Sequence, residues 1–425
     1  MRTRILTVML SLVAAGATAQ PTPVAPQESL RPSARPFLST QGAATAVAPD
    51  VLGPAGFRDW VAEFRDRALD QGISTSVFDA AFRGVRYDPA VIKRDRNQNE
   101  FTKTVWVYLD SAASDARIAA GRKALEANRA LLDRIEAKYG VDKQAVLAIW
   151  GLESAYGTFR GSDPVIQSLA TLAYDTRRAD FFEGQLVDAL TILQSGDTSV
   201  AHMRGSWAGA MGHTQFMPSS FLELAEDWNG DGKRDIWSDD PADALASAAH
   251  YLAENGWTHG QPWGVEVTLP DDFDYTLAAR EIEKSAADWA ALGVRGTDGA
   301  PVADHGPASI LLPGGHEGAA FMIFGNFSVI ESYNTADAYV IGVGHLGDRI
   351  MGAGPIRHGW PREDRALTLP ERKELQTRLR SAGFDPEKID GRIGPLTINA
   401  VRDYQQSAGM VPDGYASLLV LDALR

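Results

Sequence analysis

Apolar residues recur every three to four positions through most of the chain from about Phe57, which is the spacing of one buried face of a helix. In the first such segment Trp60, Phe64 and Ala68 fall on the same side of a helix. The pattern predicts further helices over five later segments: about 112–138, 142–154, 179–195, 217–228 and 241–254. The chain is therefore expected to be mainly α-helical.

The pattern changes between about 262 and 345. Residues 265–269 and 321–324 are short apolar runs rich in valine, isoleucine and phenylalanine, and glycine- and proline-rich turns separate them. These features predict a small antiparallel β subdomain inserted in the helical body.

The N-terminus has the pattern of a targeting segment. Arg2 and Arg4 precede a short apolar stretch that ends in Ala17-Thr18-Ala19, a small-x-small cleavage pattern, so residues 1–19 are expected to be a signal peptide. A buried N-terminal helix is the alternative, but polar, proline-rich sequence follows directly.

Composition shifts divide the rest of the chain. The segment after the signal has no apolar period and is expected to be a tether, and a second interruption by glycine, proline and charge predicts a linker. The expected parts are a tether over 20–51, a large domain over 52–351, a linker over 352–366 and a small domain over 367–425.

Composition and charge exclude several classes of function. Of the 425 residues, 44% are hydrophobic, enough for a sizeable core, while the net charge of -14 argues against nucleic-acid binding because it repels phosphate. The absence of cysteine excludes disulfides, thiolate metal sites and a lipid-modified cysteine. No apolar run of about 20 residues follows the signal, so we expect no membrane insertion and a soluble, periplasmic protein.

A carboxyl group at the end of one predicted helix is a candidate general acid. Glu153 follows an apolar helix face and stands one turn from Trp150 and Tyr156. Apolar neighbours disfavour the ionised form of a carboxyl group, and a general acid must be protonated when it acts. Taken alone, a glutamate at a helix end is more often a solvated surface residue.

Two further segments carry polar groups suited to binding sugars. Residues 205–219 place three glycines, Ser206, Gln215 and aromatic side chains in one loop, and residues 331–339 add Asn334 and two tyrosines. Glycine allows the backbone to approach a ligand closely, while amides and hydroxyls give neutral hydrogen bonds.

Together the three segments resemble the lytic murein transglycosylases of the membrane-bound B type, over about residues 55–350. The Glu-x-x-x-Gly motif of that family corresponds to Glu153 to Gly157, and its Gly-Ser-aromatic-Ala-Gly-Ala-Met-Gly-x-x-Gln-Phe-Met-Pro-Ser block runs from 205 to 219. Its Tyr-Asn-x-x-x-x-Tyr block corresponds to 333–339. The resemblance implies a lysozyme-like catalytic domain.

Carried over residue by residue, the resemblance implies a role for each matching position. Glu153 would act first as acid and then as base. Arg177 and Arg178 would contact the carboxylates of stem peptides, with a solvated helix start as the alternative. The full set of implied substrate-binding residues is Tyr156, Arg177, Arg178, Ser206, Gln215, Phe216, Tyr333, Asn334 and Tyr339, in which Ser206, Gln215 and Asn334 line the cleavage subsites and Phe216, Tyr333 and Tyr339 shape the groove.

The number of acids near the groove bears on the reaction. Ordinary glycosidases use two carboxylates, whereas these segments offer only one convincing acid. A lone glutamate can protonate the leaving oxygen and then deprotonate the sugar's own C6 hydroxyl, which gives a 1,6-anhydromuramoyl end. The expected function is therefore a lytic transglycosylase that cuts the MurNAc–GlcNAc bond of peptidoglycan. A hydrolytic muramidase and an inactive wall-binding scaffold are the alternatives.

A separate motif predicts a structural calcium site. Residues 227–235 match the D-x-[DN]-x-[DN]-G loop, in which position 7 supplies only its carbonyl oxygen. The usual closing glutamate is absent, so Asp243 or Asp239 would have to close the site, and the resembling family favours Asp243. The predicted ligands are Asp227, Asn229, Asp231, Lys233 and Asp243. A metal-free turn is the alternative, and the resemblance implies no organic cofactor.

The C-terminal domain carries its own signature. Apolar residues at helical spacing and the two Asp-Gly turns at 390–391 and 413–414 predict three short helices, and the arrangement resembles the peptidoglycan-binding module of many wall enzymes. A generic three-helix bundle is the alternative. The expected partners are peptidoglycan glycan strands and stem peptides, with cell-wall synthesis or division complexes as further candidates.

Overall fold

The computed structural model describes residues 54–96, 103–175 and 177–425. The predicted signal peptide (1–19) and tether (20–51) lie outside these ranges. In the described ranges, no helix combines the length and the apolar run needed to cross a bilayer.

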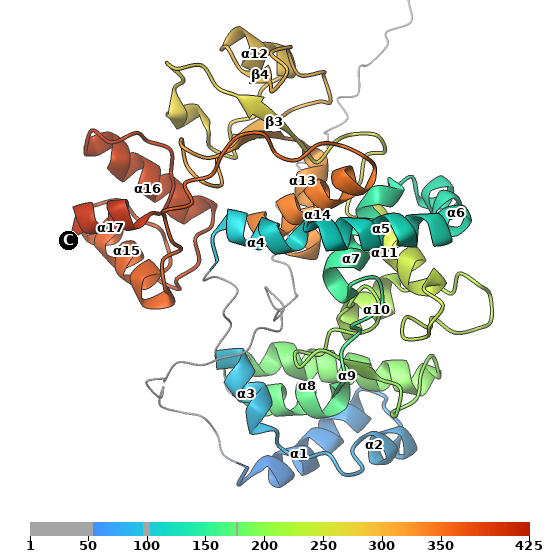
Figure 1. Cartoon of the computed structure of the whole chain (residues 1–425). Helices are drawn as coiled ribbons and strands as arrows, with labels where there is room; N and C mark the ends of the chain where they lie inside the picture. The colour runs from blue at the N-terminus through green and yellow to red at the C-terminus, as the bar shows by residue number, and fades with distance from the viewer. Residues whose placement is uncertain (1–53, 97–102, 176) are drawn as a thin grey trace, which may run out of the picture.

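A helical lobe forms one end of the molecule (Figure 1). Its first helix buries the predicted apolar face, where the rings of Trp60 and Phe64 stack with centroids 5.2 Å apart. Helices α8 and α9 pack along each other, and the other three helices lie against them. The lobe comprises α1 (Phe57–Asp70), α2 (Thr75–Ala81), α3 (Pro89–Arg96), α8 (Val165–Tyr174) and α9 (Ala179–Ser195).

A second group of helices surrounds α7, which ends at the candidate acid. Helices α5, α6, α11 and α14 all pack against α7, which explains why nearly every residue of α7 is buried. The group comprises α4 (Val105–Ala112), α5 (Asp115–Ala127), α6 (Arg129–Tyr139), α7 (Lys143–Ser154), α10 (Pro218–Leu224), α11 (Ala242–Glu254), α13 (Gly325–Tyr333) and α14 (Asp337–Ile350).

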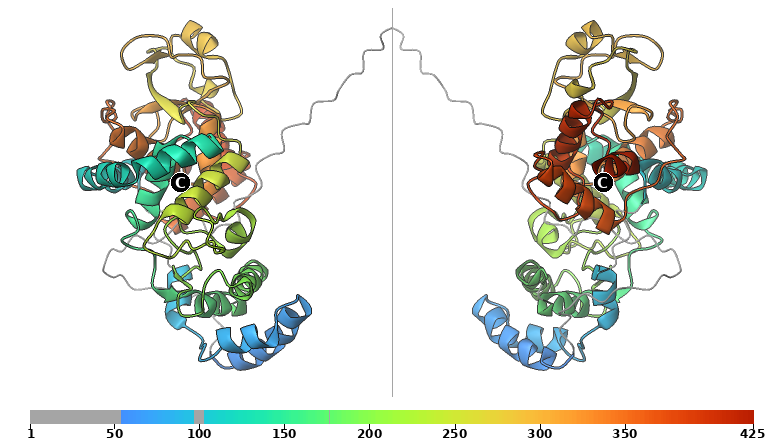
Figure 2. Two further views of the ribbon diagram at one scale, coloured as in Figure 1. Left: turned by 90° about the vertical axis from the view of Figure 1, so that its right-hand side faces the viewer. Right: turned by 90° about the vertical axis from the view of Figure 1, so that its left-hand side faces the viewer.

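A small antiparallel sheet forms the opposite end of the molecule from the helical lobe (Figure 2). Its strand order is β4-β3-β6-β5, with Val265 of β3 and Ile310 of β5 both opposite Met322 of β6. It has its own apolar core, in which Trp289 is fully buried. The elements are β3 (Gly264–Thr268), η2 (Tyr275–Leu277), α12 (Ala286–Ala291), β4 (Arg295–Gly296), β5 (Ser309–Leu311) and β6 (Ala320–Ile323). A separate short ladder joins β1 (Asp163–Pro164) to β2 (Arg204–Gly205).

The C-terminal unit contains the three expected helices around a third apolar core. They are α15 (Leu369–Ser381), α16 (Pro395–Ser407) and α17 (Leu418–Leu424). Thr368 and Glu371 form a capping box at the start of α15, which satisfies backbone donors there. The prediction of a mainly α fold with a small antiparallel β subdomain and a C-terminal helical unit is confirmed.

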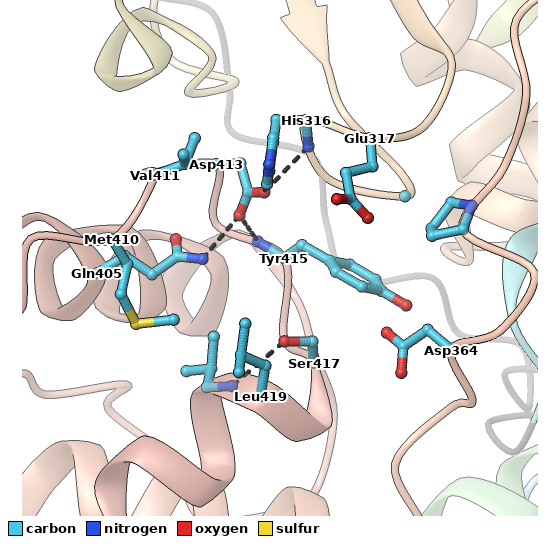
Figure 3. A pocket seen from close by; sticks show the side chains of 13 residues that line it. His316, Glu317, Asp364, Gln405, Met410, Val411, Asp413, Tyr415, Ser417 and Leu419 are labelled. Atoms are coloured by element: carbon cyan, nitrogen blue, oxygen red, sulfur yellow. Dashed lines mark hydrogen bonds and ion pairs between the residues drawn. The ribbon is translucent and has the colours of Figure 1, made fainter.

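The C-terminal unit docks against the sheet end of the molecule. Figure 3 shows Asp413 of this unit between His316 and Gln405. Its carboxylate lies 2.6 Å from Nδ1 of His316 and accepts a hydrogen bond from the Gln405 amide at 2.7 Å. A cavity of about 410 Å³ lies at this junction, lined also by Glu317 and Asp364.

Two helix predictions were wrong in extent. The segment 112–138 is two helices, because the chain leaves helical geometry at Asn128 (φ -115°) and α6 starts in a new direction. The segment 217–228 is helical only to Leu224, because Ala225 is extended and leads into the acidic loop.

Candidate active site

Glu153 lies in the last turn of α7. The preceding helix is buried on almost all sides, while Glu153 itself is half-buried at the surface of this helix group. The carboxyl group is therefore held on a rigid element and remains accessible from one side.

The backbone after Glu153 reverses sharply. Ala155, Tyr156 and Gly157 all have positive φ, at 49°, 56° and 84°. Two non-glycine residues in the left-handed region store backbone strain, which persists only where the surroundings hold it. At Gly157 a Cβ would lie 2.5 Å from the ring of His213, so this position requires glycine for space as well as for conformation.

The end of α7 is tied to the glycine-rich loop through Ser154 and His213. The Ser154 hydroxyl donates to the His213 carbonyl at 2.6 Å and accepts from the Gly157 amide at 2.9 Å. Trp150 Nε1 donates to His213 Nδ1 at 3.0 Å, so His213 carries its proton on Nε2, which donates to the Ser238 carbonyl at 2.7 Å. Burial lowers the pKa of His213 and keeps the ring neutral. His213 is therefore a buried link between two of the three segments.

The third segment reaches Glu153 directly. The Tyr339 hydroxyl, from the first turn of α14, donates to Glu153 Oε1 at 2.7 Å. Tyr339 is buried, so its ring has little freedom to move away. The structure thus brings together two predicted residues that are 186 positions apart in the sequence.

The predicted subsite residues Ser206, Gln215 and Asn334 hold local backbone geometry. Ser206 Oγ accepts from the amides of Ala208 and Ala210, at 3.3 and 3.1 Å. Gln215 has positive φ (55°) and donates to the carbonyl oxygens of Arg160 and Gly212. Asn334 is half-buried between α13 and α14, and its Oδ1 accepts from the Ala336 amide at 3.1 Å.

Phe216 and Tyr333 lie in the core. Both side chains are almost fully buried, and the Tyr333 hydroxyl donates to the Thr214 carbonyl at 2.6 Å. Their rings contact each other and Tyr251. They can affect a groove only by supporting the backbone of the glycine-rich loop, because their faces are covered.

Tyr156 packs against α7 itself. Its ring meets Trp150 edge to face and covers Gly151, where a Cβ would lie 2.6 Å from the tyrosine ring. The hydroxyl donates to the Arg117 carbonyl at 3.1 Å, and burial raises the pKa of Tyr156. The side chain therefore locks the turn after Glu153.

Arg177 and Arg178 both contact one buried carboxylate. Arg178 Nη2 lies 2.8 Å from Asp95 Oδ1, and Arg177 Nη1 donates to the Asp95 carbonyl at 3.1 Å. Asp95 in α3 is only 2% exposed, so the pair joins the start of α9 to α3. Arg177 is the more exposed of the two, so an anion can reach its guanidinium more easily.

The predicted calcium loop has the backbone folded around its acidic side chains. Asp227 accepts hydrogen bonds from the amides of Gly230, Asp231 and Gly232. Asn229 Oδ1 accepts from the Asp231 amide two residues later, which is the hydrogen bond of an Asx turn.

The structure also separates the two candidates for closing the loop. Asp243, at the start of α11, accepts from the amides of Trp228 and Asp235 at 2.9 and 2.8 Å and is 2% exposed. Asp239 is exposed and pairs with Arg160. Burial raises the pKa of Asp243, and the nearby charge of Asp227 raises it further. A buried carboxylate beside another carboxylate fits a site that holds a divalent cation.

Glu136, Asp142 and His259 form a second group close enough to hold a metal ion. Lys143 already lies 2.9 Å from Glu136, so a positive charge is supplied there by the chain itself.

The two acidic side chains of the third segment, Glu331 and Asp337, both pair with Arg280. Arg280 Nη1 lies 2.7 Å from Glu331 Oε1, and Nη2 contacts Asp337 Oδ1. Sequence reasoning did not single out Arg280, because nothing local marks it and its partners are more than 50 positions away.

Two known families match parts of the chain. Residues 56–348 match the family described as Transglycosylase SLT domain, and residues 368–424 match the family described as peptidoglycan binding domain. Membrane-bound lytic murein transglycosylase B of Escherichia coli (strain K12) is 33% identical over 226 residues, which is 52% of this chain and 60% of that protein. The chain thus matches less than two thirds of this relative's length.

Solved structures show the same fold. The chain is similar to SltB3 from Pseudomonas aeruginosa in complex with NAG-anhNAM-pentapeptide, with 48% identity and a TM-score of 0.84 over 87% of this chain and 99% of that chain. It is also similar to Escherichia coli Slt35 in complex with calcium, with 27% identity and a TM-score of 0.60 over 68% of this chain and 92% of that chain.

Proposed function

The chain belongs to the transglycosylase SLT family, and on that premise we propose that it is a lytic transglycosylase of peptidoglycan. It cuts the MurNAc–GlcNAc β-1,4 bond without water and leaves 1,6-anhydromuramoyl ends. The relative SltB3 was crystallised with NAG-anhNAM-pentapeptide, a fragment that carries an anhydro sugar.

Glu153 carries the reaction in this proposal. Its protonated carboxyl gives a proton to the leaving GlcNAc oxygen as the glycosidic bond breaks. The resulting carboxylate then takes the proton of the MurNAc C6 hydroxyl as that oxygen bonds to C1. The attack is intramolecular, so the nucleophile needs no separate binding step. The Tyr339 hydroxyl donates to Glu153 Oε1 at 2.7 Å and so orients the carboxyl group for proton transfer.

The single observation that supports this reaction best is the pairing of Arg280. A hydrolase of the ordinary kind needs a second carboxylate across the bond. Glu331 and Asp337 are the acids of the third segment, and Arg280 binds both. The glycine-rich loop from 205 to 219 contains no acid at all. Glu153 is thus left as the acid that the three segments offer to substrate.

The test is digestion of purified sacculi by the wild type and by Glu153→Gln. We expect the variant to release soluble fragments at least about 100-fold more slowly, since general acid-base catalysis contributes on that order. Glu126→Gln, at an exposed position of α5, is the control and should match the wild type. Full activity of Glu153→Gln would refute the assignment, and products one water heavier would favour the muramidase.

The proposed function also includes where the chain acts and what holds it there. Export through the predicted signal peptide would place the chain in the periplasm, where its substrate lies. The C-terminal unit, which matches the peptidoglycan binding domain family, would hold it on glycan strands and stem peptides. Partners in wall synthesis or division stay a prediction.

We further propose that calcium binds the loop closed by Asp243. Asp227, Asn229 and Asp231 would supply side-chain oxygens, and Lys233 its carbonyl. Bound calcium would neutralise the loop's carboxylates and fix the connection between α10 and α11. The calcium in the Slt35 structure supports this assignment.

A further inference from the structure

Arg280 is a largely covered cation that no step of the proposed reaction uses. It lies between η2 and α12 in the sheet end of the molecule, and four-fifths of its side chain is covered. Burial alone would lower its pKa, but the charges of Asp337 and Glu331 outweigh burial and raise it. Its guanidinium also lies over the ring of Phe327, 5.0 Å from the centroid. The cation is therefore held on several sides.

The two carboxylates that Arg280 binds flank the turn of the third segment. Glu331 belongs to the last turns of α13, and Asp337 is the first residue of α14. The turn between them carries Asn334, and Tyr339 follows two residues after Asp337. One guanidinium thus fixes both ends of the segment that presents Tyr339 to Glu153.

The backbone of Arg280 is itself anchored. Its carbonyl accepts from the Ser309 hydroxyl on β5 at 2.8 Å, and the neighbouring Ala278 carbonyl accepts from Arg402 of the C-terminal unit at 2.7 Å. A planar fork on an anchored backbone holds its partners with more geometric precision than a flexible ammonium.

An ion triad that is about three-quarters covered, as this one is, is an inefficient way to stabilise a fold. Removing charged groups from water carries a desolvation penalty, and apolar residues of similar size often give equal or greater stability. Ion pairs are directional, so they fix the direction of the α13–α14 turn better than apolar packing would. We propose that Arg280 is a positioning residue for the reaction, acting on Glu153 through the α13–α14 turn and Tyr339. This inference rests on the proposed function of Glu153.

The kinetic test compares Arg280→Met and Arg280→Lys in the full chain with the wild type, on a soluble peptidoglycan fragment. We expect Arg280→Met to lower kcat at least about 10-fold with KM changed less than about twofold, because Tyr339 serves the proton transfer rather than binding. Arg280→Lys should be intermediate, since an ammonium can hold one carboxylate well but not both. A kcat for Arg280→Met within twofold of the wild type would overturn the proposal.

A double-variant cycle separates positioning from simple destabilisation. In a Tyr339→Phe background, Arg280→Met should lower kcat by a further factor of less than about two, because the hydrogen bond from Tyr339 to Glu153 is already absent. The same proportional loss in both backgrounds would overturn the proposal. Arg67→Met is the matched control, since Arg67 makes a part-buried, two-bond contact with Glu183 in the helical lobe and should leave kcat unchanged.

A crystal structure of Arg280→Met, or of Arg280→Lys if the first variant does not fold, tests the inference without any activity. We expect the Tyr339 hydroxyl to move beyond hydrogen-bonding distance of Glu153 Oε1. An unchanged separation of 2.7 Å would overturn the proposal. If the wild type makes no anhydro product, the proposed function fails, while this structural comparison still decides the role of Arg280.

Discussion

Asp348 is a part-buried carboxyl group on α14, the helix that also carries Tyr339. Burial raises the pKa of Asp348 to about 6, and the hydrogen bond that Trp263 Nε1 donates at 2.9 Å offsets only part of that effect. Since the pKa is higher in the folded state than in the unfolded chain, the protonated form favours folding, and that advantage disappears as pH rises through about 6.

Replacement of Asp348 by Asn should therefore stabilise the protein only at higher pH. The difference in unfolding free energy should be near zero at pH 4 and grow to the order of 3 kcal/mol above pH 6.5, from about 1.4 kcal/mol per pKa unit. Urea titrations of the wild type and Asp348→Asn across pH 4 to 8 measure this difference. A difference that does not change with pH would show that Asp348 ionises as it does in the unfolded chain.

The individual residues of the site were only partly predictable from sequence. Glu153 and Tyr339 stand in recognisable motifs, but their hydrogen bond joins two helices far apart in sequence and depends on how α14 packs on α7. The link through His213 and the clamp by Arg280 depend equally on tertiary packing. A lone arginine between two short elements has no periodicity or spacing that would distinguish it from a solvated one.

At the scale of elements, the best predictions were of long helices with one strong apolar pattern. The segments 142–154, 179–195 and 241–254 agree with α7, α9 and α11 to within one residue at each end. The failure at 112–138 has a physical reason. The helical spacing continues through Ala127 and Asn128 in sequence, but the backbone leaves helical geometry at Asn128, and α6 then packs on α11. Apolar spacing indicates which residues are buried, and the same spacing can continue across the boundary between two consecutive helices.

The loop between α10 and α11 is the proposed calcium site. Millimolar calcium should raise the melting temperature of the wild type, because a ligand that binds only the folded state stabilises it by mass action. Asp227→Asn should raise the calcium concentration needed for this effect at least about 10-fold, since it removes a ligand charge while the amide oxygen can still accept from the Gly230 and Asp231 amides. Calorimetry with calcium and with magnesium measures the shift.

Asp239→Asn is the control for this experiment. Its carboxylate is exposed and pairs with Arg160, so the calcium response should survive. No response of the wild type to calcium, or loss of the response in Asp239→Asn alone, would contradict the assignment of Asp243 as the closing ligand.

At the scale of the whole molecule, the C-terminal unit is docked on the segment that carries Arg280. Arg402 of α16 donates to the Ala278 carbonyl at 2.7 Å, and Asn399 donates to Glu281 at 2.6 Å. Arg402 is only 5% exposed, so its guanidinium is committed to this contact. The C-terminal unit therefore supports the same part of the structure that carries Arg280.

Removal of this contact should loosen the unit without unfolding it, because its own apolar core remains. We expect Arg402→Ala to increase the radius of gyration in small-angle scattering and to speed proteolysis within the linker. Arg380→Ala, which removes an exposed pairing within the unit, should change neither. An unchanged radius and unchanged cleavage in Arg402→Ala would show that other contacts hold the unit in place.

The central claim is that one carboxyl group cleaves the glycan without water. The direct measurement is digestion of purified sacculi in ¹⁸O-labelled water, followed by mass spectrometry of the released muropeptides. We predict anhydromuramoyl ends that carry no label and no added water. Reducing ends that carry one ¹⁸O would contradict the account and identify the enzyme as a hydrolase.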